Sequence, residues 1–187
     1  MSEEDLLNSH ITPEALINHY GRERAYAAAA DLAGYVAVPP TITEFIEDDE
    51  FCGRFLGKGK LYPTWKEYLE YIFQDPFSCK YREIAVTGSI GSGKTTFCAA
   101  GAAYDLCKLL YLKNPQETFG LLPTKPIVLA CINTTKALAQ AALYNTLMEW
   151  SNESPFFATQ QTMVPHKDKR KKRDLFPHKV NIMNASQ

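Results

Sequence analysis

No part of the 187-residue sequence approaches the ~20 consecutive apolar residues that a membrane-spanning helix needs. The acidic start, Met-Ser-Glu-Glu-Asp, lacks the apolar stretch of a signal peptide. No C-x-x-C pair occurs, and no histidine stands at zinc-ligand spacing, which argues against a zinc site or a disulfide framework. We therefore expect no membrane partner, a location inside the cell, and reduced thiols at all five cysteines, which are Cys52, Cys79, Cys98, Cys107 and Cys131.

The composition is neither fibrous nor disordered, since 45% of the residues are hydrophobic and 22% are charged. The length suffices for one domain with an appended arm. The net charge of -1 conceals an asymmetry, because residues 1–80 hold 14 acidic and 7 basic side chains, whereas residues 81–187 hold 7 and 13. The second half is therefore better suited to a polyanionic partner.

Helices are predicted throughout the first part of the chain. Alanine-rich sequence over residues 13–34 predicts two short helices broken at Gly21, which we interpret as a packing arm rather than a DNA-reading helix-turn-helix. Thr41 or Thr43 is expected to cap a short helix through Ile46. Pro63 opens a further helix, whose apolar and aromatic stripe should pack on the core: Trp65, Tyr68, Leu69 and Ile72. We place a helical N-terminal arm over residues 1–62 and a nucleotide-binding domain over residues 63–187.

A glycine-rich loop at residues 88–95 matches the pattern G-x-x-x-x-G-K-[ST] without a mismatch. A short apolar run, residues 83–87, precedes it, and helix-forming residues 97–112 follow it, which is the order a phosphate-binding loop (P-loop) requires. The glycines let successive backbone N–H groups point inward at phosphates, and the helix N-terminus adds its positive end. The predicted nucleotide-binding residues here are Gly88, Ser89, Ile90, Gly91, Ser92, Gly93, Lys94, Thr95 and Thr96.

Three of these residues have distinct predicted roles. Lys94 is the mobile cation for the β- and γ-phosphates and the candidate catalytic residue. The Thr95 hydroxyl is expected to complete the shell of a Mg²⁺ ion that bridges those phosphates. Thr96 either lends a hydroxyl to the α-phosphate or occupies the first helical turn. ATP and Mg²⁺ are therefore the expected cofactors.

A second apolar run, residues 127–132, has the length and continuity of a parallel strand buried on both faces. The Asn-Thr-Thr stretch at 133–135 is expected to cap a helix from Lys136 to Trp150. The order strand, loop, helix, strand, helix predicts an α/β fold: a P-loop NTPase of the RecA/ASCE-like type with a parallel sheet flanked by helices.

An acid at the end of a second apolar strand, which a P-loop ATPase uses to hold Mg²⁺, has no counterpart after Lys94. The best strand there ends in Asn133, and residues 179–184 alternate like a strand without a closing element. We therefore expect a truncated chain that binds nucleotide but lacks its own catalytic acid. The acids that follow the loop are Asp105, Glu117, Glu149, Glu153, Asp168 and Asp174.

Six of the seven residues 167–173 are lysine or arginine. Contact with a nucleic-acid backbone and a solvated loop without a partner are equally good interpretations of this run, and a nuclear-targeting signal is a weaker third. No aromatic residue interrupts the run, so stacking on a single strand is not indicated.

The order of segments resembles the large subunit of tailed-bacteriophage terminases. Four stretches that together cover most of residues 40–157 carry this resemblance: Pro-Thr-Ile-Thr-Glu-Phe-Ile at 40–46, the P-loop, the strand-to-helix unit 127–150, and Ser-Pro-Phe-Phe at 154–157. The resemblance implies an ATPase that drives double-stranded DNA into a procapsid. It also makes Gln74, which lies ahead of the loop, a candidate adenine contact.

The same resemblance implies a set of partners. These are double-stranded DNA, the portal protein, a small terminase subunit and further copies of the chain in a homo-oligomeric ring, all in the cytoplasm of an infected host cell. A nuclease domain is implied further along. The acidic strand, the arginine finger and the nuclease domain of that family have no match in these 187 residues.

Two other classes of function remain open. A small P-loop nucleoside or nucleotide kinase fits the length, but such enzymes begin near their P-loop, whereas 87 residues precede this one. They also need an acceptor-site acid after a strand. The other class is a nucleotide-gated assembly module that never hydrolyses ATP.

Overall fold

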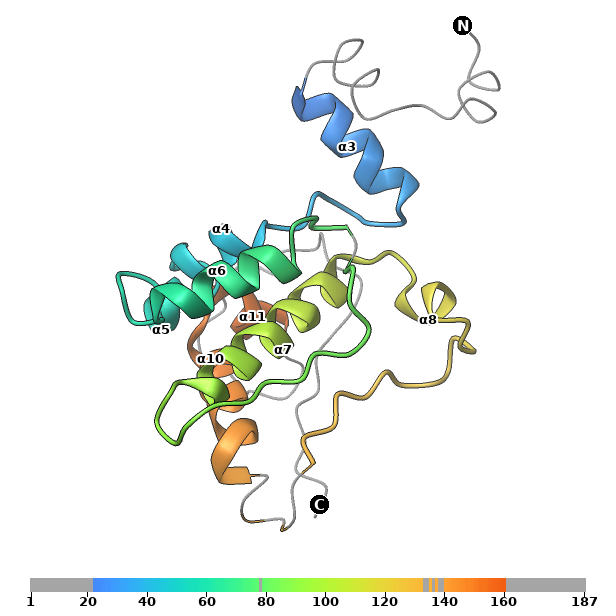
Figure 1. Cartoon of the computed structure of the whole chain (residues 1–187). Helices are drawn as coiled ribbons and strands as arrows, with labels where there is room; N and C mark the ends of the chain where they lie inside the picture. The colour runs from blue at the N-terminus through green and yellow to red at the C-terminus, as the bar shows by residue number, and fades with distance from the viewer. Residues whose placement is uncertain (1–21, 78, 133–134, 136, 138–139, 161–187) are drawn as a thin grey trace, which may run out of the picture.

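A computed structural model describes residues 22–77, 79–132, 135, 137 and 140–160 (Figure 1). Every regular element within these residues is helical. The only β feature in the described ranges is a single antiparallel bridge between Tyr35 and Leu112. In chain order the elements are α3 (Arg22–Leu32), α4 (Ile42–Glu47), α5 (Gly53–Leu56), α6 (Pro63–Ile72), α7 (Lys94–Tyr111), α8 (Pro115–Thr118), the π-helical η1 (Gln140–Tyr144), α10 (Asn145–Glu153) and α11 (Pro155–Gln160).

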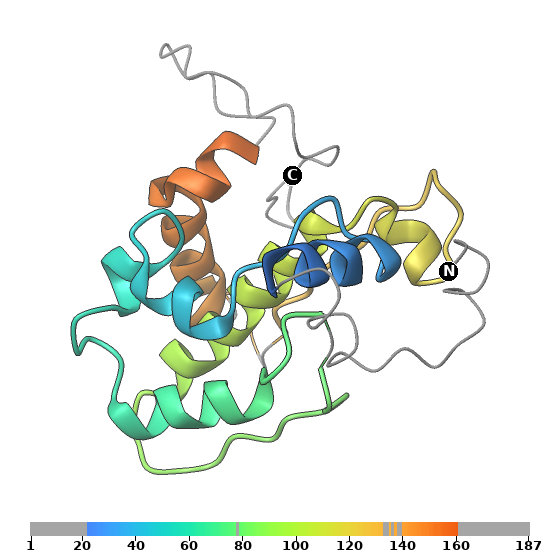
Figure 2. The same ribbon diagram turned by 90° about the horizontal axis from the view of Figure 1, so that it is seen from above.

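The long helix α7 lies at the centre, with α6 alongside it and contacts to α4 and α10 (Figures 1 and 2). Alanines at 99, 100 and 103 give α7 a narrow buried face, which lets neighbouring helices approach closely. Tyr104 is fully buried on that face, and its hydroxyl donates a hydrogen bond to the Pro40 carbonyl at 2.9 Å. Its ring lies 5.3 Å from that of Phe45 and 5.0 Å from that of Phe73, between ring centroids. Tyr104 therefore joins three helical segments.

An aromatic cluster ties α11 to the residues around α4. Phe156 lies 5.2 Å from Phe51 and Phe157 lies 6.3 Å from Phe45, measured between ring centroids. The backbone N–H of Phe156 also donates to the Glu50 carbonyl at 3.0 Å. Segments about a hundred residues apart in sequence are thus parts of one core.

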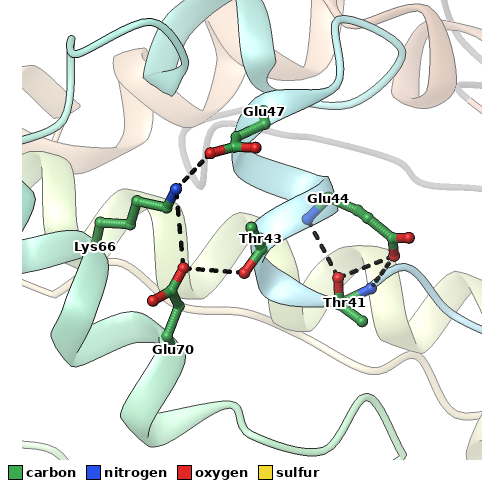
Figure 3. A network of polar contacts seen from close by, with 6 residues as sticks. All are labelled: Thr41, Thr43, Glu44, Glu47, Lys66 and Glu70. Atoms are coloured by element: carbon green, nitrogen blue, oxygen red, sulfur yellow. Dashed lines mark hydrogen bonds and ion pairs between the residues drawn. The ribbon is translucent and has the colours of Figure 1, made fainter.

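The N-terminal end of α4 is capped by Thr41, one of the two threonines that the sequence offers for this role (Figure 3). The Thr41 hydroxyl accepts from the Glu44 N–H at 3.2 Å, and the Glu44 carboxylate accepts from the Thr41 N–H at 2.7 Å. This reciprocal arrangement is a capping box. On the other side of α4, Lys66 contacts Glu47 and Glu70 together, which fastens α6 to α4 through exposed and half-exposed charges.

The structure confirms several predicted helices and corrects others. The second arm helix, the helix opened by Pro63 and the helix after the P-loop are present as α3, α6 and α7. The predicted core stripe is wrong at Tyr68, which is about half exposed because the buried face of α6 is narrower than the stripe. The helix predicted from Lys136 takes a π-helical form over η1 before α10 begins. The first arm helix and the first two residues of the predicted cap at 133–135 lie outside the described residues.

The two predicted strands are extended but unpaired within the described ranges. Residues 83–87 and 127–132 have no ladder, and Figure 1 draws both as plain extended ribbon. Their apolar side chains are largely exposed, for example Val128 at 74% and Ile132 at 89%. A strand needs a neighbour to accept its N–H groups. The parallel sheet therefore remains a prediction.

Helices α4 and α5 pack in one core with α6 and α7, on both sides of the predicted boundary at residue 62. That boundary itself stays a prediction. None of the helices in the described part of the chain has the length and apolar character needed to cross a bilayer.

Candidate nucleotide-binding site

The P-loop joins the extended residues 83–87 to the first turn of α7. Gly91 and Gly93 adopt left-handed backbone angles, with φ of 82° and 83°, which side-chain-bearing residues rarely take. Lys94 and Thr95 then open α7. Because the first N–H groups of a helix have no acceptor within it, they are available to an anion at this end.

The Lys94 ammonium folds back over the loop. It donates to the Gly88 carbonyl at 2.9 Å and to the Ser89 carbonyl, and it lies 3.4 Å from the Ser92 hydroxyl. The Lys94 side chain therefore bridges the two ends of the loop and places one positive charge between them. A phosphate entering there would exchange these carbonyl contacts for stronger, charge-assisted hydrogen bonds.

The two threonines lie differently. Thr95 is exposed and Thr96 is half-buried, both in the first turn of α7. A hydroxyl beside an ammonium and helix N–H groups is a donor set that fits a magnesium-bound triphosphate, in which Thr95 would hold the ion and supply an oxygen ligand. Ile90 lies in the loop with its side chain fully exposed, so it does not contribute to the core.

Two aromatic residues at the start of α6 contact the loop. The Trp65 indole N–H donates to the Ser92 carbonyl at 2.5 Å, and the Trp65 ring lies 4.7 Å from that of Phe97. A Cβ placed on Gly93 would come within 3.0 Å of Tyr62 and 3.1 Å of the Trp65 nitrogen. The sequence indicates only that Trp65 faces the core, and no local pattern pairs it with the loop.

Gln74 is not brought to the loop. It lies two residues beyond the end of α6 at Ile72, whereas Trp65, which contacts the loop, is in the first turn of that helix. No hydrogen bond joins Gln74 to the P-loop among the described residues. Its assignment as an adenine contact stays a prediction without support from this arrangement.

Two of the described acids that follow the loop, Asp105 and Glu153, are engaged away from it. Asp105 is eleven residues beyond Lys94 on α7, roughly 16 Å along the helix. Glu153 pairs with Arg54 at 3.5 Å. In the described ranges no three His, Cys, Asp or Glu side chains gather in a way that could hold a metal ion. Asp168, Asp174 and the basic run at 167–173 lie outside the described residues.

Titratable groups along α7 are shifted toward their neutral forms. Burial raises the pKa of the Cys107 thiol well above its ordinary value and, more mildly, the pKa of Cys98 in the second turn. Burial also lowers the pKa of the Lys108 ammonium, which lies 5.6 Å from the Tyr104 ring centroid and 5.8 Å from that of Phe73. Lys108 is therefore part of the core, whereas Lys94 belongs to the loop.

A glycine loop closed by a lysine at the start of a central helix defines a P-loop domain, which is a nucleotide-binding class. Comparison with protein families agrees, because residues 42–186 match the family described as "Uncharacterized protein MJ0330, N-terminal P-loop domain". The chain belongs to this family. The match begins at α4 and therefore takes in the segment ahead of the P-loop.

No curated protein and no solved structure matches the chain.

Proposed function

We propose that this chain is the ATP-binding part of a viral DNA-packaging motor, a terminase large subunit that couples ATP hydrolysis to movement of double-stranded DNA into a procapsid. ATP binds with Mg²⁺ at the P-loop. The motor acts as a homo-oligomeric ring with the portal protein and a small terminase subunit, in the cytoplasm of the host cell. The parallel sheet and the nuclease domain of that class belong to the same proposal.

The observation that carries the nucleotide part is the position of the Lys94 ammonium. It lies against the carbonyls of Gly88 and Ser89 and close to the Ser92 hydroxyl, and its residue opens the N-terminal end of α7. A positive charge, a helix N-terminus and glycine turns converge on one point. This combination binds polyphosphate by charge and by backbone N–H groups.

The packaging part is supported by how the resembling stretches sit together. Phe45 from residues 40–46, Tyr104 from the helix after the P-loop, and Phe157 from residues 154–157 meet in one aromatic cluster. Two of the four stretches that carry the resemblance to terminases, 40–46 and 154–157, are thus packed in one core with the helix that bears the loop. A small kinase would not require the segment at 40–46.

The first experiment measures binding of ATP with Mg²⁺ by calorimetry to the chain and to Lys94→Ala. Loss of charge-assisted hydrogen bonds to phosphate predicts affinity about 10- to 100-fold weaker in the variant. Lys113→Ala is the matched control, since Lys113 follows the far end of α7 and pairs with Asp31. Unchanged affinity in Lys94→Ala contradicts the site, and circular dichroism checks that the variant keeps its helices.

The second experiment measures ATP turnover of the full-length protein with and without double-stranded DNA, because residues 1–187 contain no candidate for the catalytic acid. A packaging motor predicts turnover that DNA stimulates. Turnover absent under both conditions favours a non-hydrolysing assembly module, and phosphate transfer to an added nucleoside favours a kinase. Either result contradicts the packaging proposal while leaving nucleotide binding intact.

A further inference from the structure

The start of α6 contacts the P-loop through a side-chain hydrogen bond and an aromatic ring contact. The Trp65 indole N–H reaches the Ser92 carbonyl at 2.5 Å, in the middle of the glycine turns. The same ring stacks at a tilt on Phe97, in the first turn of α7, at 4.7 Å between centroids. One side chain therefore touches the loop on one side and the following helix on the other.

Tyr62 completes the contact from the residue before α6 begins. Its ring carbons would lie 3.0 and 3.2 Å from a Cβ on Gly93, closer than real side-chain contacts normally come. Gly91 has nearly the same backbone angle, but no atom lies within 4 Å of a Cβ placed there. The lack of a side chain at Gly93 is therefore required both by its backbone and by the aromatic wall beside it.

We propose that Trp65 is a positioning residue for the nucleotide site: with Tyr62 as a wall, it holds the Ser92–Gly93 turn in the curled form that directs backbone N–H groups at phosphate. The loop does not hold this shape by glycine content alone. Occupation of the loop by nucleotide therefore changes the surroundings of the Trp65 ring. The shaping of the loop by Trp65 does not depend on the proposed function. The response of Trp65 to nucleotide does rest on the proposed nucleotide binding.

The carbonyl of Ser92 is what makes Trp65 more than a packing residue. A phenylalanine at this position would keep the ring beside Phe97 but could not donate to that carbonyl. The peptide between Ser92 and Gly93 would then be free to rotate, and the Gly93 N–H would lose its fixed direction. Phosphate binding would weaken more than the stability of the core.

The first test needs no nucleotide and uses the chain's own tryptophans, of which there are two. In a Trp150→Phe background, Trp65 alone emits. Gly93→Ala is expected to shift the Trp65 emission to longer wavelength and to increase its quenching by acrylamide, because the added methyl group displaces the ring. Gly91→Ala, which shares the strained backbone angle without the contact, is expected to leave the emission unchanged. Equal spectra for both alanine variants overturn the contact.

The second test measures ATP binding by equilibrium dialysis and follows Trp65 emission in the same samples. The emission is expected to change with the same dissociation constant that dialysis gives. Trp65→Phe is expected to bind ATP about fivefold more weakly, the effect of one lost hydrogen bond, while its thermal midpoint stays close to that of the parent. A steady emission signal during measured binding, or parental affinity in Trp65→Phe, overturns the positioning role.

Two variants control for general damage to α6. Tyr68→Ala removes an exposed ring that lies 5.8 Å from Trp65 but does not reach the loop, and it is expected to bind ATP normally. Tyr62→Phe keeps the ring carbons that face Gly93 and is expected to behave like the parent, whereas Tyr62→Ala is expected to weaken binding. If the parent chain binds no ATP, the proposed function fails, and the spectra of the glycine variants still decide the contact.

Discussion

The helices bury their apolar side chains, whereas the two extended segments leave most of theirs exposed. In the layer formed by α4, α6, α7 and α11, side chains such as Phe45, Tyr104 and Phe156 are fully buried. Along residues 127–132, apolar side chains of similar character face outward, with Ile132 at 89% exposure. The sequence is strongly apolar in both regions, so composition does not account for the difference.

The difference lies in where each element finds its hydrogen-bond partners. A helix satisfies its backbone within itself, so α6 and α7 need only a side-chain interface to become stable neighbours. A parallel strand has no partner until another strand lies beside it, and that pairing joins residues distant in sequence. Residues 127–132 therefore expose contiguous apolar side chains and lack a neighbouring strand, whereas the helices form their backbone hydrogen bonds internally and bury their apolar faces against one another.

The sharpest way to break this comparison is to truncate one side chain in each region. Tyr104→Ala removes a buried ring and its hydrogen bond to Pro40, and it is expected to lower the free energy of unfolding by about 3–5 kcal/mol. Ile132→Ala, at the end of the second extended segment, is expected to change it by less than about 0.5 kcal/mol. Urea denaturation measures both. A comparable loss in the two variants would mean that the extended stretch is buried in solution.

Tyr104→Phe sharpens the same experiment. It keeps the ring between Phe45 and Phe73 and removes only the hydroxyl, so about 1 kcal/mol is expected to be lost. A loss of unfolding free energy as large as that of Tyr104→Ala would mean that the hydrogen bond, and not the packing of the ring, supplies most of the stabilisation by Tyr104.

The cysteines report on the two regions without any large substitution. Cys52 and Cys107 are fully buried in the helical layer, and burial raises the pKa of the Cys52 thiol to about 12. Cys79 is exposed and Cys131, in the second extended segment, is half-buried. Since thiolate is the reactive form, Cys52 is expected to react with an aromatic disulfide at pH 8 at least about 100-fold more slowly than Cys79.

Cys131 decides the comparison in that assay. It is expected to react at a rate closer to that of Cys79 than to that of Cys52, and single cysteine-to-serine variants assign each phase. If Cys131 were as protected as Cys52, the segment at 127–132 would be covered in solution by a part of the chain outside the described residues or by a second copy.

Local signals explain which parts of the site and fold the sequence could predict. The cap at Thr41, the proline at the start of α6 and the glycines of the P-loop each act within four residues, and each was readable. The contact between Trp65 and Ser92 spans 27 residues and depends on how α6 packs on α7. Helical spacing shows only which face a residue shares, so it placed Tyr68 in the core with Leu69, although the structure exposes Tyr68.

The smallest predicted effect concerns the most local of these signals, the capping box of α4 (Figure 3). Thr41→Ala removes the oxygen that accepts from the Glu44 N–H, and it is expected to cost about 1 kcal/mol of unfolding free energy. Glu44→Ala removes the carboxylate that accepts from the Thr41 N–H and from the Thr41 hydroxyl, and it is expected to cost less, because water can replace that exposed acceptor. Both are measured by urea denaturation.

Glu67→Ala, an exposed position in the interior of α6, is the control for loss of a surface polar group, and it is expected to lie within about 0.5 kcal/mol of the parent. If Thr41→Ala cost no more than this control, α4 would be held by its buried side chains and its contacts with α6 rather than by its cap. The helical layer would then depend on long-range packing as fully as a sheet depends on strand pairing, and the contrast between the two regions would reduce to which partners are present.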